Sequence, residues 1–331
     1  MKNSINRPRI LITHPIFQEG LDRLEQHCDI EYIGDRPAYS PQELLEKLSD
    51  KEGALFTPSE KVTSDILQQA KNLKIISNIA VGYNNFDLEA MTQKNIMGTN
   101  TPDVLTDTTA DLGFALLMAT ARRMSESERW MRNGQWLKWE LGGMLGVDVH
   151  HTTLGIMGMG RIGQALAKRA LGFDMKIIYH NRTRLSADVE SEYQAKYVDK
   201  ETLLKQADHV ILVMPYSPES HHFIGARELE LMKPTATLIN IARGGIVDDQ
   251  ALASALKNNR IFAAGLDVFE GEPDLIPELL QVPNIVLTPH IGSASKMTRY
   301  AMMNLAIDNL LAGLHGEKPK NLLNPEAFQR L

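Results

Sequence analysis

The most specific chemical signal in this sequence is a glycine-rich turn between a strand pattern and a helical pattern. Residues 153–163 read TLGIMGMGRIG, and a helix is expected from 164 to 171. In such a setting the first glycine permits a tight turn, the second lets a pyrophosphate approach the backbone, and the third lets the helix pack on the strand. Amides at the helix start then donate to the phosphates, which makes a purely structural glycine turn the weaker alternative. The expected cofactor-binding residues of this turn are Gly158, Gly160, Arg161, Ile162 and Gly163.

The segment after the next expected strand indicates which dinucleotide would bind. An NAD site normally places an acidic residue there, where it binds the ribose hydroxyls. Residues 179–184 read YHNRTR and contain no acid, and Asp174 precedes the strand. Guanidinium groups bind a 2′-phosphate in a bidentate way, so we expect NADP(H) to be preferred, with NAD(H) as the second candidate and two solvated surface arginines as the structural alternative. The residues expected at this end of the cofactor are Asn181, Arg182, Thr183 and Arg184.

Three residues follow late strands of the sequence and suit chemistry on a substrate beside a nicotinamide. Arg243 lies in NIARGGIVDD, where a fixed guanidinium would bind a substrate carboxylate and polarise its carbonyl. His290 lies in TPHIGSAS, and histidine is the usual proton shuttle near neutral pH. Glu272 lies in GLDVFEGEP, and a carboxylate partner would fix the tautomer of a histidine and favour its charged form. Each alone has a structural alternative, such as a salt bridge or a turn residue, but together with the glycine turn they predict catalysis.

The elements that must position these residues form two series of alternating strand and helix patterns. Such alternation predicts parallel sheets with helices on both faces, so we expect an α/β fold of two doubly wound parallel-sheet domains. Ligands of such sheets bind at the carboxyl ends of the strands. The expected strands are 9–13, 29–33, 53–56, 74–77 and 96–98 in the first series, and 153–157, 176–179, 209–214, 236–240, 263–268 and 285–287 in the second.

Two long helices and one irregular segment are expected besides these strands. Residues 106–123 place acids early and arginines late, as the helix dipole favours, and residues 294–313 form the second long helix. The segment 124–150 is less regular and contains all three tryptophans, which are Trp130, Trp136 and Trp139. These side chains form either a local core or a subunit contact, since tryptophan is enriched at interfaces.

The composition excludes several classes of protein. The 331 residues suggest two domains, and the 43% hydrophobic content is ordinary for a globular protein. A net charge of −6 argues against a nucleic-acid partner, which needs a basic face. The single cysteine, Cys28, excludes an intramolecular disulfide. The N-terminus does not resemble a signal peptide and the longest apolar stretch, 112–121, is too short to span a bilayer, so a cytoplasmic protein with no membrane partner is expected.

Two pairs of adjacent histidines, at 150–151 and 221–222, resemble metal ligands only superficially. Neighbouring residues on a strand point to opposite faces of a sheet. Since the sequence also shows no third ligand beside either pair, no metal site is expected.

Six runs of residues resemble the D-2-hydroxyacid dehydrogenase family and follow its order along the chain. The finer likeness, carried by VLTDTTAD, DVHHTTLGIMGMGRIGQA and HIGSASKMTRY, is to its glyoxylate/hydroxypyruvate (2-ketoacid) reductase subgroup. The six runs are VGYNNFD at 81–87, TPDVLTDTTAD at 101–111, GMGRIG at 158–163, NIARGGIVDD at 240–249, GLDVFEGEP at 265–273 and TPHIGSAS at 288–295.

The resemblance implies roles for the matched positions. Arg243 would bind the substrate, and His290 would be the proton donor. In the family the supporting glutamate precedes a proline, which selects Glu272 over Glu270. The resemblance also implies that the amides of Val81 and Gly82 hold the substrate carboxylate. Thr109 and Asp267 resemble cofactor contacts, with Asp267 at the nicotinamide amide.

The resemblance further implies how the chain is divided and assembled. A Rossmann-type NADP-binding domain would span 103–293, and a discontinuous, flavodoxin-like substrate-binding domain would combine 1–102 with 294–331. The catalytic cleft would lie between the domains and close on binding. The family also implies a homodimer formed through the segment after the first long helix, which favours subunit contacts for the three tryptophans. A tryptophan that reaches into the partner's active site is one form that such a contact would take.

These observations predict NADPH-dependent reduction of glyoxylate, hydroxypyruvate or a related small 2-keto acid to the 2-hydroxy acid, D-configured where the product is chiral. One alternative is a family member that acts on a larger 2-keto acid, such as 2-ketogluconate. A second alternative, from another class, is a catalytically silent protein that senses dinucleotides. The intact Arg243, Glu272 and His290 argue against the silent alternative.

Overall fold

A computed structural model describes residues 7–34 and 39–329. The chain divides into two compact units. One unit is continuous and spans Thr106–Ser293, whereas the other combines both ends of the chain, Met1–Leu105 and Ala294–Leu331. The structure therefore contains two parallel-sheet α/β domains, which confirms the predicted fold class.

The unit built from the chain ends contains a five-stranded sheet in the order β2-β1-β3-β4-β5, in which all neighbouring strands are parallel. This is the strand order of flavodoxin-like folds. The sheet strands are β1 (Arg9–Ile12), β2 (Asp29–Tyr32), β3 (Gly53–Phe56), β4 (Ile75–Asn78) and β5 (Met97–Thr99). The helices of this unit are α1 (Gln18–Glu25), α2 (Pro41–Leu48), α3 (Ser64–Gln69), α4 (Leu88–Gln93), α13 (Lys296–Leu314) and α14 (Pro325–Phe328).

Successive residues of these strands supply two separate cores, one on each face of the sheet. Leu11 belongs to the core that contains Leu44 and Leu48 of α2. Ile10 and Ile12 belong to the opposite core, which α1 and α13 complete. This period of two is what a sheet covered on both faces requires.

Helix α13 belongs to the first unit because it packs closely against that unit's sheet. A Cβ added at Gly313 would lie 2.5 Å from Ile75 Cδ1, and one added at Gly53 would lie 2.9 Å from Leu310 Cδ1. The buried hydroxyl of Ser77 also donates to the carbonyl of Ala306 over 2.8 Å. The long C-terminal helix was predicted at 294–313 and is observed two residues later at its start and one at its end.

The continuous unit contains a seven-stranded parallel sheet in the order β12-β11-β10-β9-β6-β7-β8. It is the Rossmann order with one further strand at the edge, and the strand order reverses between β6 and β9. The strands are β6 (Thr153–Met157), β7 (Lys176–His180), β8 (Ala195–Tyr197), β9 (His209–Leu212), β10 (Thr237–Asn240), β11 (Ala263–Leu266) and β12 (Ile285–Leu287). Strand β8 was not predicted.

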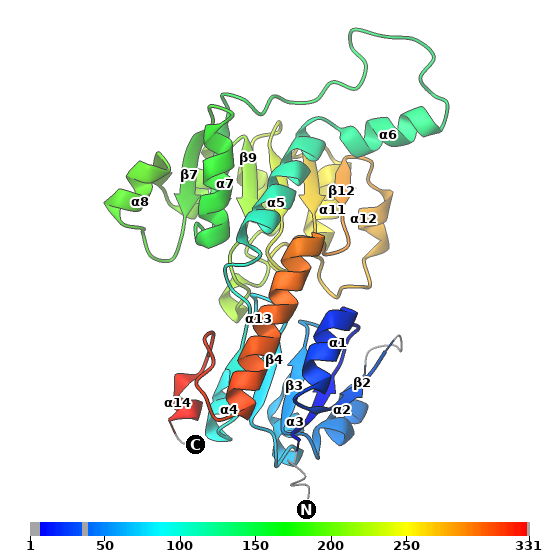
Figure 1. Cartoon of the computed structure of the whole chain (residues 1–331). Helices are drawn as coiled ribbons and strands as arrows, with labels where there is room; N and C mark the ends of the chain where they lie inside the picture. The colour runs from blue at the N-terminus through cyan, green and yellow to red at the C-terminus, as the bar shows by residue number, and fades with distance from the viewer. Residues whose placement is uncertain (1–6, 35–38, 330–331) are drawn as a thin grey trace, which may run out of the picture. The chain divides into compact units, whose positions relative to one another are not determined.

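The helices of this unit cover both faces of its sheet, and Figure 1 shows α5 and α7 side by side on one of them. In one core, α5 and α7 pack against strand residues such as Ile156 and Ile211. In the other core, the helices α9, α10 and α11 pack against strand residues such as Val210 and Leu212. The helices are α5 (Thr106–Ala121), α6 (Met124–Arg132), α7 (Arg161–Leu171), α8 (Ala187–Glu192), α9 (Lys200–Gln206), α10 (Ala226–Leu231), α11 (Asp249–Lys257) and α12 (Pro277–Gln281), with one 3₁₀ turn, η1 (Pro218–Ser220).

The segment predicted to be irregular, 124–150, begins with a helix, α6. Residues 133–152 then contain no helix or strand and form a long loop that projects from the unit (Figure 1). Helix α6 was missed because its nine residues are mostly polar, with Met124, Trp130 and Met131 as the large apolar side chains, and none of its residues is buried. Within the described part of the chain, no helix combines the length and apolar character that a bilayer crossing demands.

Candidate active site

The glycine turn joins β6 to α7 at the point where the strand order of the sheet reverses. Gly158 has φ +99°, and a Cβ there would lie 2.7 Å from the amide nitrogen of Met214. A Cβ at Gly163 would lie 2.5 Å from the carbonyl oxygen of Gly158, so this glycine lets α7 pack against the turn. At Gly160, by contrast, a Cβ would meet no atom within 4 Å. The open face of the middle glycine therefore leaves room for a phosphate at the start of α7, where Arg161 and Ile162 supply the first helical amides.

A pocket of about 510 Å³ lies beside this turn. Its lining includes Gly158, Gly160, Asn181, Arg182 and Thr183, which the sequence predicted as cofactor contacts. The side-chain oxygen of Asn181 also accepts from the amide of Met159 over 2.7 Å, so Asn181 holds the glycine turn. These residues and their open space fit a dinucleotide that extends from the turn toward the end of β7.

The two arginines of the YHNRTR run have different surroundings. Arg182 lines the pocket. Arg184 instead donates from Nε and Nη2 to the two carboxylate oxygens of Glu190, over 2.8 and 2.7 Å. Tyr179 donates to the same carboxylate, and together these hydrogen bonds lower the pKa of Glu190 to about 2. The structure thus gives Arg184 an ion-pairing role that the sequence did not reveal.

One acid in the pocket was missed by sequence reasoning. Glu219 lines the pocket together with Arg182. A hydrogen bond from Ser217 and, further, the charge of Arg182 lower the pKa of Glu219. Because Glu219 comes from η1, far along the chain from β7, no spacing rule within the YHNRTR run points to it.

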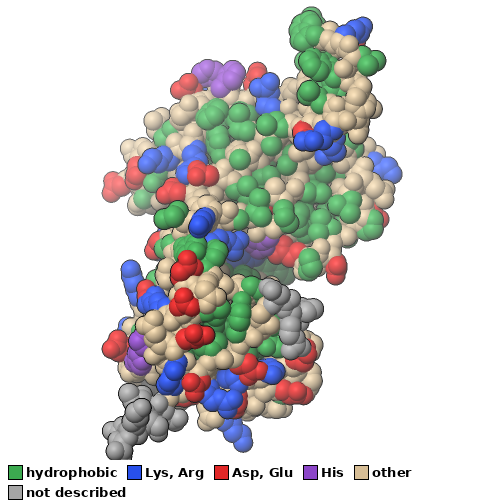
Figure 2. Space-filling view, turned by 45° about the vertical axis from the view of Figure 1, so that its right-hand side comes forward, with side chains coloured by type: hydrophobic (Ala, Val, Ile, Leu, Met, Phe, Trp, Pro, Cys, Tyr) green, Lys and Arg blue, Asp and Glu red, His purple; other side chains and the backbone are tan. Residues whose placement is uncertain are grey.

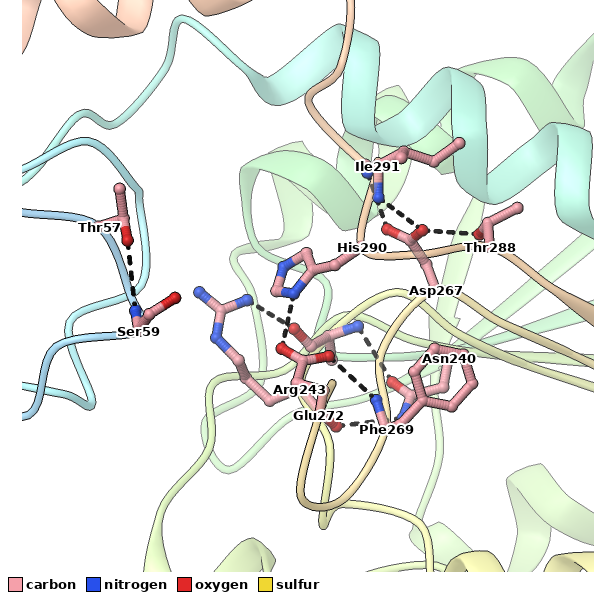
Figure 3. A network of polar contacts seen from close by, with 12 residues as sticks. Thr57, Ser59, Asn240, Arg243, Asp267, Phe269, Glu272, Thr288, His290 and Ile291 are labelled. Carbon is pink, nitrogen blue, oxygen red and sulfur yellow. Dashed lines mark hydrogen bonds and ion pairs between the residues drawn. The ribbon is translucent and has the colours of Figure 1, made fainter. Parts of the chain in front are cut away.

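The predicted catalytic residues lie together in the continuous unit (Figure 3). Nδ1 of His290 is 2.7 Å from Oε1 of Glu272. Oε2 of Glu272 accepts from the amide of Phe269 over 3.3 Å. Burial acts to raise the pKa of Glu272, but the hydrogen bond and charge of His290, the Phe269 amide and the charge of Arg243 lower it on balance. The carboxylate is therefore ionised at neutral pH and can fix the orientation of the imidazole.

The Arg243 guanidinium and the His290 ring lie on the same side of the loop that carries Glu272 (Figure 3). Asn240, the last residue of β10, fixes the turn through two hydrogen bonds. Its Nδ2 donates to the Arg243 carbonyl over 3.1 Å, and its Oδ1 accepts from the Ala242 amide over 3.0 Å. A Cβ at Gly244 would lie 1.7 Å from the carbonyl oxygen of Phe269. Glycine at this position therefore lets the arginine segment lie directly against the loop that carries Glu272.

Asp267 is buried and holds the loop that carries His290. Its carboxylate accepts from the hydroxyl of Thr288 over 2.6 Å and from the amides of Ile291 and Gly292 over 2.8 Å each. Desolvation by burial raises the pKa of Asp267, although these hydrogen bonds oppose the shift. His290 itself adopts a left-handed backbone conformation with φ +51°. The structure thus shows Asp267 holding the Thr288 side chain before His290 and two backbone amides after it, a contact set that the sequence did not predict.

Thr109, the other predicted nicotinamide-side contact, lies close to Asp267. A Cβ at Gly292 would be 3.4 Å from Cγ2 of Thr109 and 3.2 Å from Oδ2 of Asp267. Thr109 belongs to the start of α5, and Asp267 follows β11. The fold thus brings two distant positions to one edge of the sheet.

Val81 and Gly82 lie in the other unit, in the loop after β4. Asn100 donates to the Val81 carbonyl over 2.7 Å, and Asn78 donates to the Gly82 carbonyl over 2.9 Å. Sequence reasoning missed these two asparagines, whose positions at the ends of β4 and β5 were the available signal. They orient the peptides of the loop by holding its carbonyls.

The argument from sequence against a third group beside His221 and His222 is wrong. Both residues follow η1 and neither lies on a strand. The carboxylate of Glu270 approaches both of them.

A Rossmann-type sheet, a glycine turn at its switch point and an arginine set beside a glutamate–histidine pair define an NAD(P)-dependent oxidoreductase. Comparison with known proteins agrees: residues 114–292 match the family described as "D-isomer specific 2-hydroxyacid dehydrogenase, NAD binding domain". The chain belongs to the D-isomer specific 2-hydroxyacid dehydrogenase family, as its sequence motifs predicted.

Relatives match over almost the entire chain. A glyoxylate reductase of Thermococcus litoralis is 48% identical over 97% of this chain and 98% of its own length. A glyoxylate/hydroxypyruvate reductase B of Klebsiella pneumoniae is 43% identical over 97% of this chain and 99% of its own. Among solved structures, an NADPH-dependent glyoxylate/hydroxypyruvate reductase from Sinorhizobium meliloti, in complex with NADP and malonate, is 33% identical with a TM-score of 0.84 and covers 97% of this chain and 98% of its own.

Proposed function

We propose that this enzyme uses NADPH to reduce glyoxylate, hydroxypyruvate or a related small 2-keto acid to the 2-hydroxy acid, D-configured where the product is chiral. The observation that carries the proposal is the 2.7 Å contact between His290 Nδ1 and Glu272 Oε1, with Arg243 beside it. Relatives with the glyoxylate reductase and glyoxylate/hydroxypyruvate reductase names support the substrate class.

The chain's own residues supply binding and proton transfer in this reaction. Arg243 binds the substrate carboxylate and polarises the carbonyl, because its guanidinium presents paired donors. Glu272 holds Nδ1 of His290, so Nε2 donates the proton to the oxygen of the forming hydroxyl group. A nicotinamide dinucleotide bound at the glycine turn would supply the hydride. We assign Thr109 and Asp267 to its nicotinamide end, and the amides of Val81 and Gly82 to the substrate carboxylate.

Substitution of the catalytic residues tests this assignment. His290→Ala removes the proton donor and is expected to lower kcat by roughly 10²–10⁴-fold. Arg243→Ala is expected to raise KM for the keto acid as well as lower kcat, because it both binds and polarises the substrate. Steady-state kinetics with glyoxylate and hydroxypyruvate, and with 2-ketogluconate as the larger competitor, measure both effects. NADPH binding without reduction of any of these acids by the wild type would support the dinucleotide-sensing alternative instead.

The preference for NADPH rests on Arg182, which lines the pocket at the end of β7, where no acid follows the strand. Arg182→Ala is expected to lower kcat/KM for NADPH at least tenfold and to change kcat/KM for NADH little, because only NADPH carries the 2′-phosphate. Arg184→Ala is the matched control, since Glu190 engages that guanidinium. Equal losses with both cofactors, or a wild-type preference for NADH, would contradict the assignment.

We also propose a homodimer formed through the projecting segment after α5. Residues 131–143 are all exposed within one chain, and they include Trp136 (53% exposed) and Trp139 (74% exposed). Figure 2 shows hydrophobic side chains gathered on this projecting arm. Exposure of this extent excludes a local core for these two tryptophans and favours a second copy as their partner.

A further inference from the structure

A cluster of two histidines and a glutamate lies outside the proposed catalytic set. His221 and His222 follow the 3₁₀ turn η1, and Glu270 follows β11. His222 has φ +49°, which turns both imidazoles to the same side; the rings stack with centroids 3.9 Å apart and planes inclined by 23°. One ligand atom from each of the three residues lies within 4.8 Å of the others. Within residues 7–34 and 39–329, no other group of this kind brings three such side chains together.

The ring atoms that face Glu270 are the ones that a metal ion would use. Nε2 of His222 is 2.8 Å from one carboxylate oxygen of Glu270, and Nε2 of His221 is 4.0 Å from the other. The opposite nitrogens have their own neighbours: Nδ1 of His221 is 3.2 Å from the Tyr216 hydroxyl, and Nδ1 of His222 is 3.9 Å from Asp248. Metal-binding histidines are commonly oriented by such contacts at the second nitrogen.

The backbone around the cluster is fixed from several elements. The amide of His222 donates to the carbonyl of Gly245 over 2.7 Å, and the amide of Glu270 donates to Asp249 over 3.0 Å. Asp248 is itself held as the N-cap of α11, accepting from the Ala251 amide. An ordinary surface ion pair between His222 and Glu270 would account for two of the three side chains but not for His221 facing the same carboxylate.

We propose that His221, His222 and Glu270 bind one divalent transition-metal ion of the Zn²⁺ class. Two imidazole nitrogens and one carboxylate oxygen are ligands that Zn²⁺ prefers, whereas Ca²⁺ and Mg²⁺ require oxygen ligands alone. Three protein ligands leave the fourth tetrahedral position to water, which the exposure of all three side chains permits. The ion would connect the 221–222 turn to the 269–272 loop, whose far end carries Glu272. The proposal stands independently of the substrate and the cofactor of the enzyme.

Direct binding of Zn²⁺ tests the site. Full-length protein without an affinity tag is stripped with a chelator, then titrated with Zn²⁺ alone by calorimetry, and its metal content is measured after equilibrium dialysis. We expect one Zn²⁺ per chain. The variants His221→Ala, His222→Ala and Glu270→Gln should each raise the Kd at least tenfold, because each removes a ligand. Zn²⁺ should also raise the melting temperature of the wild type but not that of Glu270→Gln.

The chain contains its own control for adjacent histidines. His150 and His151 also neighbour acids, at 3.9 Å, but among the described residues they belong to no group of three ligand atoms. The double variant His150→Ala/His151→Ala should therefore bind Zn²⁺ as the wild type does. The proposal is overturned if the wild type binds no Zn²⁺, if all three ligand variants retain the wild-type Kd, or if the control variant loses as much affinity as His222→Ala. If one ligand variant does not fold, the other two and the wild-type melting shift decide the outcome.

Discussion

At the scale of single residues, the surroundings of two carboxylates shift their pKa values in opposite directions. Glu272 is supported by His290, Arg243 and a backbone amide, which lower its pKa on balance against its burial. Asp249 lies in the opposite environment: desolvation by burial, with the nearby charges of Glu270 and Asp248, raises its pKa to about 6. The two cases lead to different behaviour with pH.

Asp249 should make the folded protein less stable as pH rises through the range from about 4 to 6. The folded state binds its proton more tightly than the unfolded state does, since the folded pKa is about 6 and the reference value is 3.8. Stability therefore falls with rising pH across this window, by on the order of 2 kcal/mol. Asp249→Asn should remove the fall and still accept from the Glu270 amide. We expect the variant to be more stable than the wild type at pH 7 and similar at pH 4, as measured by urea unfolding.

The matched control for this prediction is Asp188→Asn, which changes an exposed acid in the first turn of α8. Its stability difference from the wild type should be small and should change little with pH. A constant difference between Asp249→Asn and the wild type across pH 4–7 would show that Asp249 ionises normally.

At the scale of elements, the turn between β6 and α7 shows that glycines of one motif have separable roles. Gly163 is required for packing, because its Cβ would meet a backbone oxygen that cannot move independently. No contact within the chain requires glycine at position 160, since a Cβ there would meet no atom within 4 Å. The distinction predicts opposite phenotypes.

Gly163→Ala should destabilise the protein by about 1–3 kcal/mol, through overpacking of the turn. Gly160→Ala should melt at the wild-type temperature but bind NADPH at least tenfold more weakly, because its methyl group would stand where the pyrophosphate approaches. Melting curves and NADPH fluorescence titrations separate the two effects. Wild-type affinity in Gly160→Ala would mean that the dinucleotide does not approach this glycine.

Most elements were predictable because their signal is local. The strands that precede Gly158, Arg243 and His290 read as short apolar runs before turn residues, and all of them are observed. Strand β8 was missed because its three residues include only one buried side chain. The pairing of Arg184 with Glu190 and the approach of Glu270 to His221 depend on the local path of the backbone, which no residue pattern specifies.

The candidate site was predictable to a similar extent and for the same reason. Arg243 and His290 follow from the chemistry that each strand end would need, and the family resemblance selects Glu272 over Glu270 as the carboxylate partner. The residues that brace them could not be named in advance, because Asp267 acts through amides of a loop from another strand, and Asn78 acts through a carbonyl of its own loop. Hydrogen bonds that hold a loop depend on which residues the fold brings together more than on the type of each side chain.

At the scale of the whole molecule, the exposed arm after α5 predicts concentration-dependent assembly. If the proposed dimer forms through this arm, Trp139→Glu should shift the mass from two chains toward one, because it places a charge within the proposed contact surface. Light scattering coupled to size-exclusion chromatography measures the mass. Met297→Glu, which alters an equally exposed side chain at 79% in the other unit, is the control and should leave the mass unchanged. A wild-type protein with the mass of one chain at all concentrations would contradict the dimer.

The division of the chain has a consequence for its synthesis. Helix α13 covers one face of the first sheet, yet it follows the continuous unit, Thr106–Ser293, along the chain. Since chains emerge from the ribosome N-terminus first, Ile10, Ile12 and Ile75 have α1 but not α13 to cover them while the whole second unit is translated. The nascent chain therefore leaves the part of this sheet face that α13 covers exposed during that interval, and a helix made after the second unit completes the core of the first.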